Sequence, residues 1–245
     1  MKKTALLTMA LVASLSLNAA AETIRLNGSS TVTKAVMAKI QEPFKRATGI
    51  DLAITGNGSG NGAKDLLDGT CDAAMASESI TDLALKLPAL SAPDIRTFVV
   101  AEDEIKVFVN RGNPVNRLSR EQIKGLHTGT IKNWKEVGGP DMEVIVVTSH
   151  KNSGNRAAFR SIAMDGEPYT NDAIEEATDI AEIKEVATMK EAISAIGVAF
   201  LDDSVKVVEA PRMARQLLLI TKGEPGPSVT KLLAFINNEG SRYIK

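Results

Sequence analysis

A glycine-rich turn at residues 56–62 is the feature that most constrains how this chain can fold. Gly56, Gly58, Gly60 and Gly62 follow the apolar run 52–54 and precede residues 63–67, which have the composition of a helix start. Glycine lets other groups approach the backbone closely, and the N–H groups of a first helical turn have no partner within the helix. A strand, a bare turn and a helix start in this order therefore predict an anion site at the turn.

Two further segments repeat this scheme with hydroxyl-bearing residues. Residues 26–31 read Leu-Asn-Gly-Ser-Ser-Thr and follow the alternating segment 22–26; residues 148–156 read Thr-Ser-His-Lys-Asn-Ser-Gly-Asn-Arg. Serine, threonine and asparagine are favoured N-cap residues, so each segment predicts a helix start. We expect the three helix starts to converge on one small oxyanion.

The spacing of apolar residues predicts an α/β fold. Val32, Val36, Ile40 and Phe44 recur every four residues, which indicates an amphipathic helix, and strands are expected at residues 50–55 and 72–77. This β-α-β-α-β order predicts a parallel sheet with right-handed crossovers. In such sheets ligands bind beyond the carboxyl ends of the strands, where the polar turns lie.

The rest of the chain continues the alternation of strands and helices. Strands are expected at residues 95–100, 105–110, 144–147, 198–201 and 217–221, and helices at 118–123, 153–163, 189–195 and 229–236. The acidic segment 102–104 separates the first two of these strands. We expect this pair of strands to carry the chain into a second lobe.

The first twenty-one residues have the features of a secretory signal peptide. Lys2 and Lys3 precede an apolar segment at residues 4–17, and residues 19–21 are alanines, which fit the small-residue rule for cleavage. The apolar segment is too short to span a bilayer, so a retained membrane anchor is the weaker alternative. We expect an exported protein whose mature chain starts at Glu22.

The composition argues against several classes of function. The formal net charge is −1, so no basic field favours nucleic acid, and no further segment is long and apolar enough for membrane insertion. The single Cys71 cannot form an internal disulfide, and two histidines with one cysteine do not favour a zinc site. No metal, other cofactor or catalytic residue is predicted.

Four segments, taken in their order along the chain, resemble the periplasmic phosphate-binding proteins of ABC transporters. These segments are residues 27–32, residues 58–64 together with 72–77, residues 118–139, and residues 153–156 with Phe159. No one of them is specific, but the ordered set covers most of the mature chain. The resemblance is therefore to the whole family pattern and not to one motif.

The resemblance implies a two-lobed periplasmic-binding-protein fold, type II-like, in which each lobe is a mainly parallel sheet flanked by helices. Lobe 1 would contain residues 22–100 and 199–245, and lobe 2 residues 101–198, with crossings near Val100 and residues 198–200. The lobes would close over the ligand by a hinge motion. The implied function is capture of inorganic phosphate in the interlobe cleft and delivery to a membrane ABC permease, by a periplasmic monomer without enzymatic activity.

The same resemblance implies a set of ligand-binding residues at the three helix starts and after the strand 72–77. The hydroxyl and N–H donors would come from Thr31 and Val32, with Ser30 an equal candidate to Thr31, from Ser59 and Gly60, and from Ser153, Gly154 and Asn155, with Arg156 inside the first turn. Glu78 stands where the family has an aspartate that accepts the proton of hydrogen phosphate. A buried carboxylate repels a fully deprotonated oxyanion and is left unsatisfied at roughly 1–3 kcal/mol, so this position would select phosphate over sulfate.

One position departs from the family pattern. The family has an arginine and then an acidic residue ahead of the third helix start, and here Ser149 and Lys151 stand near those places. Lys151, Arg156 and His150 are the candidates to replace the missing cation. The identity of the anion therefore depends on how this position is filled.

Other interpretations of the same residues remain open. The same fold could bind another oxyanion or a small carboxylate. Residues 58–63 also satisfy the dinucleotide pattern G-x-G-x-x-A, with Glu78 twenty residues after Gly58, as in an NAD-dependent oxidoreductase. Hydrolase and P-loop functions are disfavoured because no G-x-S-x-G motif and no Walker lysine spacing occur.

Overall fold

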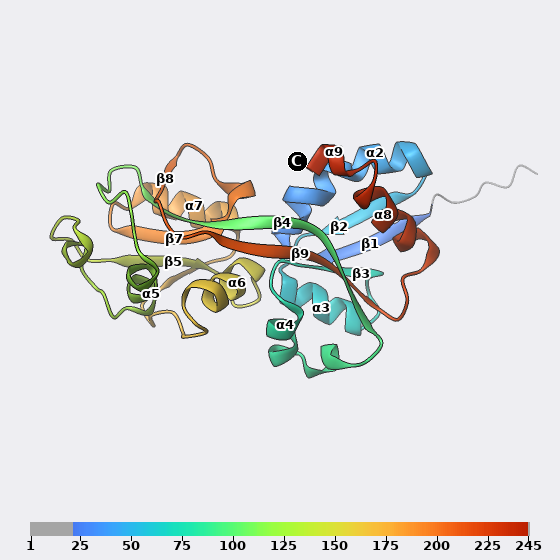
Figure 1. The fold of residues 1–245 in the computed structure, drawn as a ribbon, viewed down its shortest axis with the longest axis horizontal. Helices are drawn as coiled ribbons and strands as arrows, with labels where there is room; N and C mark the ends of the chain where they lie inside the picture. The colour runs from blue at the N-terminus through green and yellow to red at the C-terminus, as the bar shows by residue number, and fades with distance from the viewer. Residues whose placement is uncertain (1–21, 245) are drawn as a thin grey trace, which may run out of the picture.

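The computed structural model describes residues 22–244, and the signal peptide predicted at residues 1–21 lies outside the described residues. Strands and helices alternate along the chain, which confirms the α/β class (Figure 1). Residues 22–110 contain β1 Thr23–Gly28, α1 Ser30–Val32, η1 Thr33–Met37, α2 Ala38–Thr48, β2 Asp51–Thr55, α3 Ser59–Leu67, β3 Ala73–Ala76, α4 Ile80–Lys86, η2 Pro88–Ser91 and β4 Ile95–Asn110. Residues 111–244 contain α5 Arg120–Thr128, η3 Trp134–Val137, β5 Ile145–Ser149, α6 Gly154–Ala163, β6 Ile174–Glu176, α7 Asp179–Thr188, β7 Ala192–Gly197, η4 Val198–Phe200, β8 Val205–Val207, β9 Met213–Lys222, α8 Pro227–Asn237 and α9 Ser241–Ile244.

The first predicted helix is one continuous helical segment from α1 to α2 with a π-helical turn, η1, inside it. Val32, Val36, Ile40 and Phe44 are all fully buried, so the predicted four-residue spacing is confirmed as the core-facing side. The segment ends at Gly49, whose φ of 74° is the left-handed conformation typical of a helix C-terminus.

The strands form one sheet in the order β2-β1-β3-β9-β4-β7-β5-β6, and β8 pairs with β4. Within each end of the sheet the strands are parallel, as predicted: β1 pairs with β2 and β3, and β5 pairs with β6 and β7. β9 and β4 are antiparallel to their neighbours, so the complete sheet is mixed. The two parallel ends correspond to the two halves of the molecule in Figure 1.

β4 and β9 are the elements that join the two halves (Figure 1). The two strands predicted at residues 95–100 and 105–110 are one strand, β4, which pairs with β9 from Ile95 to Ile105 and has an irregularity between Val99 and Ala101. The acidic segment 102–104 lies inside this strand because Asp103 is opposite Arg215 and forms an ion pair with it. Asp103 therefore belongs to a buried ion pair within the strand and not to a loop between two strands.

Two other expectations for local structure are wrong. Residues 192–197, expected to be helical up to residue 195, form β7, and the helix lies earlier, in α7. Residues 198–200, expected in a strand, form the short 3₁₀ helix η4. Every residue of β7 is buried, and a short continuous apolar run of this kind does not distinguish a central strand from a helix.

Hydrophobic clusters lie on both sides of the sheet in each half. Residues of β1, α2, β9 and α8 form one cluster in the first half, and residues of β4, α5, α6 and β7 form another in the second half. Phe200 and Val205 pack with Phe108 in the second half, and Met213 belongs to the same half. The division into lobes stays a prediction, and we place its second crossing within β9.

No helix within residues 22–244 is both long enough and apolar enough to cross a bilayer.

Candidate functional site

The three predicted helix starts meet at the boundary between the halves. The start of α3 comes from the first half and the start of α6 from the second, and they touch: a Cβ atom added to Gly154 would lie 2.2 Å from Ser59 Oγ and 2.3 Å from Ser77 Oγ. The Ser77 N–H donates to Ser59 Oγ at 3.1 Å. A side chain at position 154 would therefore separate the halves, which explains why glycine stands there.

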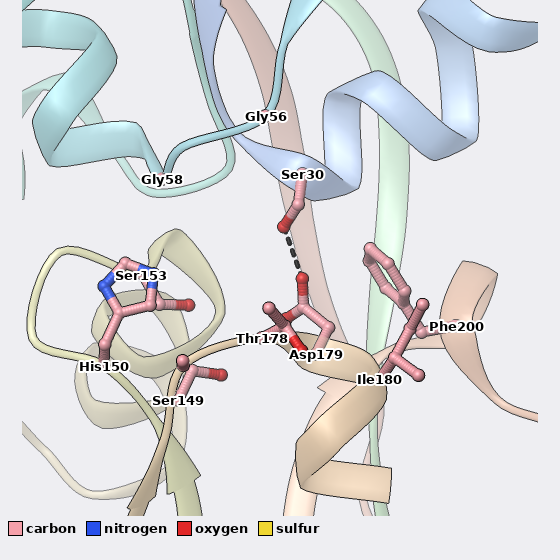
Figure 2. Close-up of a pocket in the computed structure, with 11 residues that line it drawn as sticks. Ser30, Gly56, Gly58, Ser149, His150, Ser153, Thr178, Asp179, Ile180 and Phe200 are labelled. Carbon is pink, nitrogen blue, oxygen red and sulfur yellow. Dashed lines mark hydrogen bonds between the residues drawn. The ribbon is translucent and has the colours of Figure 1, made fainter.

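At the first helix start the three hydroxyl residues Ser29, Ser30 and Thr31 have different roles. Ser29, and neither Ser30 nor Thr31, is the N-cap, since its Oγ accepts from the Val32 N–H at 3.2 Å. Ser30 Oγ donates to Asp179 across the boundary, a contact drawn in Figure 2. Thr31 Oγ1 lies 3.3 Å from Asn155 Oδ1 of the second half. Ser30 and Thr31 thus both reach the opposite half.

The third helix start is capped as predicted. Ser153 Oγ accepts from the Asn155 N–H at 3.2 Å and from the Arg156 N–H at 3.5 Å. The Asn155 side chain donates to Asp179 Oδ1 at 2.6 Å. Arg156 instead donates through Nη1 to Glu175 Oε2 at 2.6 Å and to the Ser149 carbonyl at 3.0 Å, so a carboxylate already holds its guanidinium.

Arg215 is the residue of this region that the sequence did not single out. It extends from β9 and is 7% exposed. Its donors reach both halves: Thr31 Oγ1 at 3.3 Å and the Ser77 carbonyl at 3.2 Å in the first, Asn155 Oδ1 at 2.5 Å and the Gly154 carbonyl at 3.4 Å in the second. A buried arginine from a distant strand therefore contacts the predicted site residues Thr31, Gly154 and Asn155.

Asp103 of β4 balances the charge of Arg215. Its Oδ2 accepts from Arg215 Nε at 2.9 Å and from Nη2 at 2.7 Å. Burial lowers the pKa of Arg215 and the Asp103 carboxylate raises it, but a guanidinium stays protonated in either case. The pair places next to the helix starts a guanidinium whose three nitrogens already donate to Asp103, to Thr31, to Asn155 and to two backbone carbonyls.

Glu78 follows β3 and is buried at 1% exposure. Its Oε2 pairs with Lys86 Nζ at 2.8 Å, whereas Oε1 has no hydrogen-bond partner among the described residues. Burial raises the pKa of Glu78, and Lys86 opposes that shift. A buried carboxylate oxygen without a donor is costly, so Oε1 is an acceptor available to a ligand that carries a proton.

Cavities lie on both sides of the contact between Ser59 and Gly154. One, of about 150 Å³, is lined by residues that include Ser30, Ser149, His150, Ser153 and Asp179 (Figure 2). Another, of about 340 Å³, is lined by Glu78 and Arg215. The predicted site residues thus border two hollows at the boundary of the halves, and their role in binding stays a prediction.

Ser149, at the place of the missing arginine, has a structural partner. Its Oγ donates to Glu182 Oε2, and Ser194 Oγ donates to Glu182 Oε1. Glu182 is 1% exposed, and burial raises its pKa to about 8. Lys151 is exposed and makes no hydrogen bond or ion pair with another described residue.

Among residues 22–244 no group of histidine, cysteine, aspartate and glutamate side chains is arranged to hold a metal ion. The donors at the boundary are hydroxyls, backbone N–H groups and one guanidinium, which is the chemistry of oxyanion binding.

Comparisons with known proteins agree on one family. The model of the PBP superfamily domain matches residues 15–237. The phosphate-binding protein PstS of Bacillus subtilis strain 168 is 26% identical over 206 residues, which cover 84% of this chain and 67% of that protein. This chain spans a smaller part of several other curated relatives, down to 36% of their length.

Solved structures give the same result over nearly the whole chain. A putative phosphate ABC transporter substrate-binding protein from Clostridium perfringens, solved with bound phosphate, has a TM-score of 0.80 and 28% identity, covering 91% of this chain and 96% of that one. An ABC-type phosphate transport receptor from Vibrio cholerae has a TM-score of 0.73 and 27% identity, covering 90% and 96%. The predicted binding-protein fold is confirmed, and this chain belongs to the PBP superfamily.

Proposed function

We propose that this chain is an exported solute-binding protein that captures inorganic phosphate between its two halves and delivers it to an ABC permease. The relatives named above are phosphate-binding proteins and phosphate transport receptors, and they support this assignment. The signal-peptide features at residues 1–21 support export to the periplasm, with cleavage near Ala21. The protein acts as a monomeric carrier and not as an enzyme.

The observation that carries the proposal is that donors from both halves meet at the boundary, between the two hollows. The starts of α1, α3 and α6 supply hydroxyls and N–H groups, and Arg215 reaches Thr31 and Asn155 from the strand between the halves. Helix N-termini and a guanidinium each favour an anion, and their effects add where water is excluded. An oxyanion held here contacts both halves and stabilises the closed arrangement.

The ligand-binding set consists of the predicted residues together with Arg215. Thr31, Ser59, Ser153 and Gly154 supply donors at the helix starts, and Ser30 contributes through its contact with Asp179. The N–H groups of Val32, Gly60 and Asn155, which donate to Ser29 Oγ, the Asn152 carbonyl and Ser153 Oγ, would exchange these acceptors for the oxyanion. Arg215 takes the part of the cation that is absent at position 149. Arg156, held by Glu175, lies at the margin of the site.

Glu78 selects the protonation state of the ligand. Its free Oε1 needs a donor, and hydrogen phosphate has a P–OH group to offer, whereas sulfate at neutral pH has none. Sulfate would leave Glu78 Oε1 without a donor and add a repulsion between like charges. This is the physical reason to choose phosphate over sulfate.

Isothermal titration of refolded, ligand-free protein with phosphate, arsenate, sulfate and citrate tests the proposal. We expect one phosphate per chain, comparable binding of arsenate, which has the same shape and proton, and weak or no binding of sulfate and citrate. Equal binding of phosphate and sulfate would contradict the role of Glu78, and binding of citrate alone would replace phosphate by a carboxylate ligand.

The second candidate, another oxyanion or a small carboxylate in the same cleft, is favoured by one observation. Ser149 stands where the family has an arginine and donates to Glu182, so no cation at that position fixes the ligand as phosphate. The same titration separates the two candidates.

A further inference from the structure

A basic pocket lies beside the site, on the side of the boundary where Glu78 and Lys86 meet. We define it by its four cations: Lys86 of α4, Lys151 of the loop before α6, and Arg156 and Arg160 of α6. Its volume is about 260 Å³, and Asp82 is the one carboxylate among the residues that line it. It is formed by both halves of the molecule.

Two of the four cations have no carboxylate partner among the described residues. Lys86 is paired with Glu78 and Arg156 with Glu175. Arg160 donates only to the Gly166 carbonyl, and Lys151 makes no hydrogen bond or ion pair with the described residues. Both side chains are exposed. With Asp82 as the one lining carboxylate against Lys151 and Arg160, the pocket presents a net positive charge to solvent in a chain whose formal net charge is −1.

The basic pocket borders the cavity that Glu78 and Arg215 line. Asp82 and Ser161 line both cavities. Lys86 Nζ is 2.8 Å from Glu78 Oε2, and Arg156 belongs to the first turn of α6, whose start is part of the site. An anion in the basic pocket is thus one cavity away from Arg215.

The residues that line the cavity of Figure 2 differ in charge from those that line the basic pocket. The cavity of Figure 2 is lined by Asp179 and by uncharged or weakly basic groups such as Ser30, Thr178 and His150. Asp179, the charged residue there, is 7% exposed and already accepts from Ser30 and Asn155. Of these two cavities, the basic pocket is the one lined by lysine and arginine.

We infer that the basic pocket is an outer collecting site for the oxyanion, through which it reaches the cleft, and that Lys151 and Arg160 accelerate its association. The inference rests on the proposed function. Cations at the mouth of a low-dielectric cleft raise the local concentration of an anion and its association rate, and this effect falls as salt screens it. Since Lys151 and Arg160 lie outside the final site, they act on the association rate and leave the dissociation rate unchanged.

Stopped-flow mixing with phosphate tests this inference. An Ile180→Cys variant, labelled with an environment-sensitive dye on the side of Figure 2, reports closure; Ile180 is 58% exposed, whereas the native Cys71 is buried. In this background Lys151→Gln with Arg160→Gln should lower the association rate constant about three- to tenfold at low ionic strength. The difference should shrink as salt is raised, and the dissociation rate constant should stay the same.

The matched control removes two positive charges elsewhere. Arg46→Gln with Lys231→Gln changes exposed residues on α2 and α8, away from α6 (Figure 1), and should leave the association rate unchanged. An unchanged rate in the Lys151/Arg160 variant, or an equal loss in the control, would overturn the inference while phosphate binding stands. Failure of the unsubstituted protein to bind phosphate in the titration would instead overturn the proposed function, and the collecting site with it.

Discussion

Each half of the molecule buries one glutamate beside the boundary, and the two are satisfied differently. Glu182 in the second half accepts from Ser149 at one oxygen and from Ser194 at the other. Glu78 in the first half pairs with Lys86 at one oxygen and has no partner at the other. A carboxyl group completed by its own chain belongs to the fold, whereas one left incomplete next to hydroxyl and N–H donors is suited to a ligand.

Arg215 contacts both halves, and its removal should have the largest effect on phosphate affinity and on stability. Arg215→Met takes away the cation that both halves share and leaves Asp103 buried without its partner. We expect at least a hundredfold loss of phosphate affinity, and a free energy of unfolding lowered by about 3–5 kcal/mol. Titration calorimetry and urea unfolding measure the two effects.

A second substitution separates binding from stability in this variant. Replacing Asp103 as well, by Asp103→Leu, removes the unpaired charge and should restore most of the stability without restoring affinity. Near-normal phosphate affinity in the double variant would show that Arg215 only neutralises Asp103. In that case Arg215 would not be a ligand-binding cation between the two halves.

Glu182 should make the protein less stable as the pH rises. The Glu182→Gln substitution should abolish this pH dependence. Burial raises the pKa of Glu182 to about 8 from an ordinary value of 4.5, so the folded protein holds this proton more tightly than the unfolded chain. The free energy of unfolding then falls with pH between these two values, by at most about 1.4 kcal/mol per pH unit, and is constant above pH 8 with respect to this group. Urea unfolding of both proteins at pH 5, 6, 7 and 8 gives the slopes.

Glu185→Gln, on the same helix, is the control for this measurement because Glu185 is only half-buried. It should reproduce the slope of the unsubstituted protein. Identical slopes for all three proteins would mean that folding does not raise the pKa of Glu182 above that of a surface carboxylate. The contrast between Glu182 and Glu78 would then weaken.

Glu78→Gln should have the smallest effect on stability and a specific effect on selectivity. The amide removes the negative charge that disfavours sulfate, so the ratio of phosphate to sulfate affinity should fall about tenfold, equivalent to one strong hydrogen bond. Competition titrations with both anions measure this ratio. Glu78→Asp retains the carboxylate and should keep the preference; an unchanged ratio in Glu78→Gln would assign Glu78 to the same structural class as Glu182.

The sequence predicts the helix starts of this site because their signals are local. Glycine and serine precede an apolar helical pattern at Ser59 and Ser153, and the structure places both residues at helix starts. The order of strands and helices in residues 22–77 is predicted correctly for the same reason. The cap of the first helix, Ser29, likewise lies within the predicted segment 26–31.

Arg215 and Asp103 were missed because their environment comes from distant parts of the chain. Arg215 contacts Thr31, 184 residues away, and Asp103, 112 residues away. A signal was present in the strands themselves. Arg215 is on the same face of its strand as the buried Met213 and Leu217, and Asp103 is on the same face as the buried Ile105. A charged residue in phase with the buried face of a strand predicts a buried ion pair, but not its partners.

Asp179 was missed through an error in secondary structure. Residues 192–197 were expected to be mainly helical, so α7, the helix that begins with Asp179, was not recognised. Alanine and isoleucine dominate that segment and suit a buried strand as well as a helix. Only the pairing of β7 with β4 and β5 decides between them, and pairing of that kind is not encoded locally.

The connection between the halves has a mechanical consequence. β4 and β9 are paired to each other from Ile95 to Ile105, so the halves do not turn about two independent single-chain hinges. Opening must bend or twist a hydrogen-bonded ribbon, which resists deformation in proportion to the angle. The irregularity at Val100 is where such a ribbon is most compliant, because the ladder there is already interrupted. We therefore propose that the elasticity of these two paired strands sets the amplitude of opening, and that the bending is centred on Val100.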